Sequence, residues 1–256
     1  MNHLKRYLLM LLISSLLACA GPTRQEQEEE RKDKEGAVIN VKLAAGYIRR
    51  GDYEVAEGKL KKAIRLDKTY IPAYTTMAVL QTIIGKPTEA ENYYLEALDL
   101  DPKNPELRNN YGTFLCKQGK YDEAFKEFNL ALKNPFYDTP EAAHANMGYC
   151  MMLKPKPDYK QVERHLRAAL AKQPKMVSAL IGMGELGIKT RQYLMARAYM
   201  QRYHALEKPT AHSLWVQIQA EYALGDKKYF MKLSKQLLKK FPQSEEAAKV
   251  MELSDL

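Results

Sequence analysis

The residues of this chain whose chemistry could define a function are three cysteines, a few histidines and one glycine-rich segment. The segment GMGELG at 182–187 matches G-x-G-x-x-G, but a dinucleotide site needs a preceding strand and a βαβ setting, and the surrounding pattern is helical. No metal-ligand spacing relates the later histidines, which are His144, His165, His204 and His212. No serine or cysteine nucleophile stands in a recognisable motif. We therefore expect a binding module rather than an enzyme, with no metal and no cofactor.

A repeated helical unit must position any binding site in this chain. Residues 119–135 read GKYDEAFKEFNLALKNP, residues 85–101 read GKPTEAENYYLEALDLD, and residues 51–67 read GDYEVAEGKLKKAIRLD. A period of about 34 residues with small residues at fixed places resembles the tetratricopeptide repeat, a helix-turn-helix unit. Small residues let the two helices of a hairpin pack closely. The expected packing residues are Gly51, Ala56, Ala63, Gly85, Ala90, Ala97, Gly112, Gly119, Ala124 and Ala131.

This repeat pattern predicts an all-α fold, a right-handed superhelical solenoid of about six tetratricopeptide repeats with a C-terminal capping helix. No segment alternates with period two over any length, so we expect no sheet. Ser244 is the expected N-cap of the capping helix. The repeats are expected at 37–70, 71–104, 105–138, 141–176, 177–210 and 211–243, within a domain at 37–256 whose cap is 244–256.

The N-terminus has the layout of a secretory signal peptide at residues 1–18. Lys5 and Arg6 precede an apolar run, and small residues follow it. The sequence LLAC that ends at Cys19 resembles the lipobox of bacterial lipoproteins, in which the thiol of the first mature residue is diacylated and its amine is acylated. Ala20 in place of Asp resembles an outer-membrane sorting signal. The alternative is an ordinary signal peptide with an incidental cysteine.

Residues 19–36 are rich in Glu, Gln, Lys and Arg and contain little that could be buried. Such a composition is typical of a solvated, flexible segment. We therefore expect a lipidated tether between Cys19 and the first repeat.

The two other cysteines, Cys116 and Cys150, fall on the first helices of neighbouring repeats. First helices of adjacent repeats pack side by side, so a disulfide is a reasonable expectation in an oxidising compartment. Two buried free thiols are the alternative, since cysteine is often buried without pairing.

Charge gives weaker information about partners. The formal net charge of +9 falls to +7 if Lys5 and Arg6 are removed with the signal peptide, because no acidic residue leaves with them. This excess of positive charge is weak evidence for nucleic-acid binding, and we expect the protein not to bind nucleic acid. An acidic protein partner or anionic lipid headgroups fit it better. The lysines concentrate near the C-terminus, at Lys227, Lys228, Lys232, Lys235, Lys239 and Lys240.

The concave face of such a solenoid is lined by positions 2, 5, 9, 12 and 13 of each first helix, and here those positions are unusually apolar. Exposed apolar patches of that extent usually mark a partner site, and an amphipathic helix or extended segment is the natural ligand. Part of the surface could instead be covered by the N-terminal segment or complete the core. The expected groove residues are Val41, Ile48, Val79, Ile83, Asn109, Thr113, Tyr149, Met152, Ile181, Ile188 and Trp215.

Two segments carry a more specific resemblance. NNYGTFLCKQGKYDEA at 109–124 and NPFYDTPEAAHANMGYC at 134–150 are similar to the PilF/PilW family of type IV pilus biogenesis lipoproteins, over essentially the whole chain. The resemblance implies a monomeric outer-membrane lipoprotein that acts as a pilotin, promoting localisation and multimerisation of the pilus secretin. It also implies Cys19 as the lipid site and a bridge between Cys116 and Cys150. The alternative is another periplasmic scaffold that serves proteases, cell-wall enzymes or barrel assembly.

Overall fold

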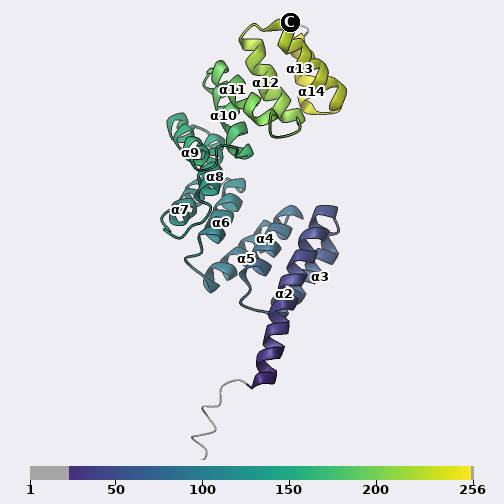
Figure 1. Cartoon of the computed structure of the whole chain (residues 1–256), viewed down its shortest axis with the longest axis vertical. Helices are drawn as coiled ribbons and strands as arrows, with labels where there is room; N and C mark the ends of the chain where they lie inside the picture. The colour runs from purple at the N-terminus through teal and green to yellow at the C-terminus, as the bar shows by residue number, and fades with distance from the viewer. Residues whose placement is uncertain (1–22, 255–256) are drawn as a thin grey trace, which may run out of the picture. The chain divides into compact units, whose positions relative to one another are not determined.

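The computed structural model describes residues 23–254 of the chain. All thirteen elements of this part are α-helices, and it contains no strand. The chain divides into two compact units, Met1–Asp101 and Pro102–Leu256. Each unit is a stack of antiparallel helix hairpins (Figure 1), which confirms the predicted all-α repeat fold.

The first unit contains two hairpins. They pair α2 (Arg24–Arg50) with α3 (Tyr53–Leu66) and α4 (Ile71–Ile83) with α5 (Pro87–Leu100). A small apolar core joins the hairpins, with Leu60, Met77 and Leu80 fully buried around Ala44. The small alanine side chains allow the helices to pack closely at these crossings.

The second unit contains four hairpins and one further helix. The hairpins are α6 (Pro105–Lys117) with α7 (Tyr121–Leu132), α8 (Pro140–Leu153) with α9 (Tyr159–Lys172), α10 (Val177–Lys189) with α11 (Tyr193–His204), and α12 (Ala211–Ala223) with α13 (Lys227–Lys240). The last helix, α14 (Glu245–Ser254), packs on α12 and α13. Its first turn is capped by Ser244, whose Oγ accepts the Ala247 N–H at 3.2 Å.

The turns inside four of the six hairpins explain why glycine recurs in the sequence. Gly51, Gly85, Gly119 and Gly225 all have φ between 74° and 83°, a left-handed conformation that glycine adopts without steric cost. The hairpin of α10 and α11 has Arg191 at this place instead, with φ of 59°. That turn therefore carries a strain that the glycine turns avoid.

The prediction of a flexible tether was wrong for residues 24–36, which form the first half of α2. Thr23 and Glu26 form a capping box at the start of this helix, and Arg31 contacts both Glu28 and Glu35. Charged residues that pair three and four positions apart stabilise a helix, whereas the prediction rested on charge content alone. Residues 1–22, including the predicted signal peptide and Cys19, lie outside the described part of the chain.

Candidate partner-binding site

A cavity of about 280 Å³ is formed by the first helices of three successive repeats in the second unit. These helices, α8, α10 and α12, contact one another in order. The residues that line the cavity are Tyr149, Met152, Leu153, Glu185, Ile188, Lys189, His212, Trp215, Val216 and Gln219. The repeat therefore places equivalent positions of three helices around one concave site.

Four of the predicted groove residues meet in this cavity: Tyr149, Met152, Ile188 and Trp215. Tyr149 is 51 % exposed, whereas Met152 is almost fully buried. Ile188 packs partly against the core that includes Leu186 and Met200. The cavity thus has an apolar floor that is continuous with the core and an aromatic side chain at its mouth.

The prediction missed Leu153, Glu185, Lys189, His212 and Gln219, although they occupy the same register. In the expected repeat frame, His212 is position 2 of its helix, Glu185 and Gln219 are position 9, and Leu153 and Lys189 are position 13. The selection favoured apolar residues, with Asn109 and Thr113 as exceptions, and it overlooked the apolar Leu153. The register itself was sufficient to find all five.

An ionic contact borders the apolar floor. Nε2 of His212 lies 2.5 Å from Oε1 of Glu185, and its Nδ1 lies 3.9 Å from Oε1 of Glu246 on α14. The hydrogen bond to Glu185 raises the pKa of His212 above its ordinary value, while burial opposes this. The site therefore combines apolar contact with a polar pair that can orient a ligand.

Three predicted groove residues are engaged in contacts within the protein instead. Asn109 on α6 is buried, and its Oδ1 accepts a hydrogen bond from Nδ2 of Asn146 on α8 at 3.0 Å. Thr113 donates from Oγ1 to the Asn109 carbonyl oxygen at 2.9 Å. Ile181 is partly buried against the core of the second unit. These side chains have less area free for a partner than the prediction assumed.

The first unit carries the remaining predicted groove residues. Val79 and Ile83 on α4 are exposed, at 43 % and 47 %. Val41 and Ile48 on α2 are half-buried and pack against the small core of this unit. A polar substitution at Val41 would therefore disturb packing, whereas Val79 is a surface position.

The predicted packing alanines, Ala56, Ala63, Ala90, Ala97, Ala124 and Ala131, are all fully buried. Cys116 on α6 and Cys150 on α8 have Cα atoms 5.9 Å apart, and their sulfur atoms lie at bonding distance. A disulfide there would join the first helices of two repeats. Oxidation of this pair in the cell stays a prediction.

Models of two tetratricopeptide-repeat families match residues 71–104 and 93–126. PilF of Pseudomonas aeruginosa, a type IV pilus assembly protein, is 28 % identical over 240 residues, which cover 93 % of this chain and 94 % of PilF. An uncharacterised protein of Haemophilus influenzae is 31 % identical over 145 residues, covering 56 % of this chain and 81 % of that protein.

Solved structures agree with these relatives. The crystal structure of PilW, a type IV pilus biogenesis factor, matches with a TM-score of 0.75 at 28 % identity, covering 84 % of this chain and 98 % of PilW. The structure of Pseudomonas aeruginosa PilF matches with a TM-score of 0.73 at 26 % identity, covering 86 % of this chain and 98 % of PilF.

The fold and the concave site define a tetratricopeptide-repeat scaffold, a class of protein that acts through protein–protein contacts. Within this class, the chain belongs to the PilF/PilW family, and its role lies in type IV pilus biogenesis. Among the described residues, no helix has both the length and the apolar character needed to cross a membrane.

Proposed function

We propose that this protein is an outer-membrane lipoprotein that binds the type IV pilus secretin and promotes its localisation and multimerisation. The family assignment supports a role in pilus biogenesis, and the sequence LLAC at Cys19 supports a lipid anchor. The observation that carries the binding proposal is the cavity between α8, α10 and α12. An apolar, concave, partly exposed site is what an amphipathic segment of a partner requires.

Tyr149 and Trp215 are the expected anchors of this interaction. Aromatic side chains bury a large area at low entropic cost, and they dominate the energetics of many interfaces. Glu185 and His212 lie beside them and would hydrogen-bond to the partner's backbone or polar side chains. Lipidation at Cys19 would hold the protein at the membrane in which a secretin assembles.

A pair of matched substitutions tests the site. Tyr149→Glu places a charge at the mouth of the cavity, where the side chain is 51 % exposed, so the fold should tolerate it. Leu194→Glu on α11 is the control, because Leu194 is 67 % exposed and does not line the cavity. In cells that make the secretin, Tyr149→Glu should abolish secretin multimers on unboiled gels, and Leu194→Glu should leave them at the wild-type level.

Circular dichroism of both variants separates loss of binding from loss of fold. If folded Tyr149→Glu protein still supports normal multimers, the secretin binds elsewhere on the protein. If deletion of the whole gene leaves the multimers intact, the secretin proposal is wrong, and a scaffold for proteases, cell-wall enzymes or barrel assembly becomes the better interpretation.

A further inference from the structure

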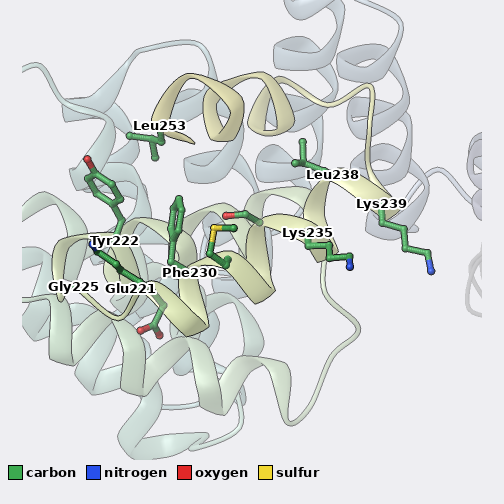
Figure 2. Close-up of a pocket in the computed structure, with 11 residues that line it drawn as sticks. Glu221, Tyr222, Gly225, Phe230, Lys235, Leu238, Lys239 and Leu253 are labelled. Atoms are coloured by element: carbon green, nitrogen blue, oxygen red, sulfur yellow. The ribbon is translucent and has the colours of Figure 1, made fainter. Parts of the chain in front are cut away.

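A second cavity lies at the C-terminal end of the second unit, between α12, α13 and α14. Its volume is about 870 Å³, against about 280 Å³ for the candidate partner-binding site, and the two share no lining residue. Tyr222, Phe230, Met231, Leu238 and Leu253 provide its apolar surface. Figure 2 shows Phe230 on α13 and Leu253 on α14 pointing toward each other across this space.

Helix α14 covers only part of this surface. It buries Leu237 through Ala247 and Val250, but it leaves Met231 64 % exposed and Tyr222 47 % exposed. In a repeat array, the first helix of each repeat covers the hairpin before it. The open surface therefore has the shape that receives a helix.

The rim of this cavity is positively charged. Lys227, Lys235 and Lys239 line it, and the sequence of α13, KKYFMKLSKQLLKK, contains six lysines and no acidic residue. No ion pair engages these six lysines anywhere in residues 23–254. Figure 2 shows Lys235 and Lys239 extending from α13 beside the apolar surface.

The one carboxylate that lines the cavity is already neutralised. Glu221 is fully buried, and it forms an ion pair with Arg197 of α11, whose Nε lies 3.1 Å from Oε1 of Glu221. Apart from the hydroxyl of Ser234, the side chains that remain to meet a ligand are therefore apolar on the floor and cationic at the edge.

We propose that this cavity is a second docking site, and that it binds an acidic amphipathic helix of a partner protein. Apolar residues on one face of that helix would cover Tyr222, Phe230 and Met231, and Asp or Glu residues at its flanks would pair with Lys235 and Lys239. A concave apolar surface is the shape that receives the apolar face of an amphipathic helix. This site extends the protein's interactions beyond the secretin contact proposed above.

Binding of a designed peptide to the purified protein tests this proposal. The probe is a fluorescein-labelled peptide of about 14 residues with Leu at helical i, i+3, i+4 and i+7 spacing and Glu elsewhere. A scrambled peptide of the same composition is its control. Fluorescence anisotropy should show binding of the amphipathic peptide that weakens with added salt, and at least about tenfold weaker binding of the scrambled peptide.

Two protein variants locate the interaction. Met231→Glu should weaken binding of the acidic peptide at least about tenfold, whereas Leu194→Glu, at an exposed leucine outside the cavity, should leave it unchanged. The double variant Lys235→Glu/Lys239→Glu should no longer bind the acidic peptide. It should instead bind a matched peptide with Lys in place of Glu. Neither measurement involves the secretin, so either proposal can fail without the other.

Four outcomes would overturn the proposal. These are no binding of the acidic peptide, equal binding of the scrambled peptide, no effect of Met231→Glu, and no exchange of preference in the double variant. Binding to vesicles of phosphatidylglycerol without binding to the peptide would assign the surface to lipid. If the peptide does not bind but sedimentation shows self-association that Met231→Glu abolishes, the surface binds a second copy of the chain.

Discussion

At the scale of single residues, stability depends on positions where a side chain has no room or no alternative partner. A Cβ atom on Gly112 would lie 2.9 Å from Cε1 of Phe128 and 3.1 Å from the carbonyl oxygen of Ala124. The two helices of the α6–α7 hairpin cross at this point. The glycine is therefore required by packing and not by backbone conformation.

Gly112→Leu should lower the free energy of unfolding by about 3 kcal/mol, because the larger side chain forces α6 and α7 apart. Gly58→Ala is the matched control, since nothing lies within 4 Å of a Cβ atom there, and alanine should stabilise α3 by up to about 1 kcal/mol. Urea unfolding measures both. A Gly112→Leu protein as stable as the wild type would mean that the hairpin can repack.

The Arg197–Glu221 pair joins α11 to α12 in a largely buried position. Arg197→Met removes the cation and leaves the buried Glu221 carboxylate uncompensated, so it should cost about 3 kcal/mol of stability. Adding Glu221→Leu should recover most of the loss, because no charge then remains buried. A double variant less stable than Arg197→Met would show that the carboxylate has another essential role.

Buried histidines should make stability depend on pH. Nδ1 of His144 on α8 lies 3.0 Å from Nδ1 of His165 on α9, and burial lowers the pKa of His165 to about 4. Burial also lowers the pKa of His144. The unfolded chain binds protons near pH 6.5, so folding loses stability as pH falls from about 6.5 towards 4. His212 has the opposite effect on folding stability. Its pKa is raised in the folded state, so it contributes stability at low pH.

His165→Asn should therefore flatten the pH dependence of unfolding between about pH 6.5 and pH 4. The wild type should lose about 2 to 3 kcal/mol more than the variant over this range. Chemical denaturation at a series of pH values gives the difference, in which contributions common to both proteins cancel. Parallel curves for the two proteins would mean that His165 is protonated without cost in the folded state.

At the scale of elements, the contact between α6 and α8 combines a hydrogen bond with a cysteine pair. Asn146 donates to Asn109 at one point of this contact, and Cys116 meets Cys150 at another. Both contacts couple the first helices of successive repeats. In a repeat stack, each repeat contacts only its neighbours, so such contacts carry much of the stability.

If the cysteines are oxidised, reduction should lower stability by about 3 to 4 kcal/mol, because the bond closes a long loop of the unfolded chain. Thermal unfolding with and without reductant measures this loss, and the Cys116→Ser/Cys150→Ser variant should show no response to reductant. Alkylation under denaturing conditions gives an independent test. Labelling of both thiols without prior reduction would establish two buried free thiols.

At the scale of the whole molecule, the proposed function requires the repeat domain to be held at a membrane. Each buried methylene of an acyl chain contributes about 0.8 kcal/mol to anchoring, and two or more chains hold firmly. Cys19→Ser should therefore give a folded protein that lacks acyl chains and leaves the outer-membrane fraction. Mass spectrometry and membrane fractionation check this. Recovery of the variant in outer membranes at the wild-type level would exclude lipidation as the anchor.

The sequence by itself determined the hairpins, their order and most of the close-packed positions. Gly51 and Ala124 illustrate why, since a left-handed turn and a crowded helix crossing each restrict the residue type locally. The register of the first helices also placed Tyr149, Ile188 and Trp215 on one face, because every repeat presents equivalent positions in the same direction. These features depend on short-range geometry repeated along the chain.

The tertiary structure alone decided which of those positions meet and which are buried. Asn109 and Ile181 share the groove register but are covered by their neighbours, and Glu185 reaches His212 only because α10 packs beside α12. The open cavity beside α13 is formed only where α12, α13 and α14 pack together. Side-chain contacts between helices depend on distances that no local pattern specifies.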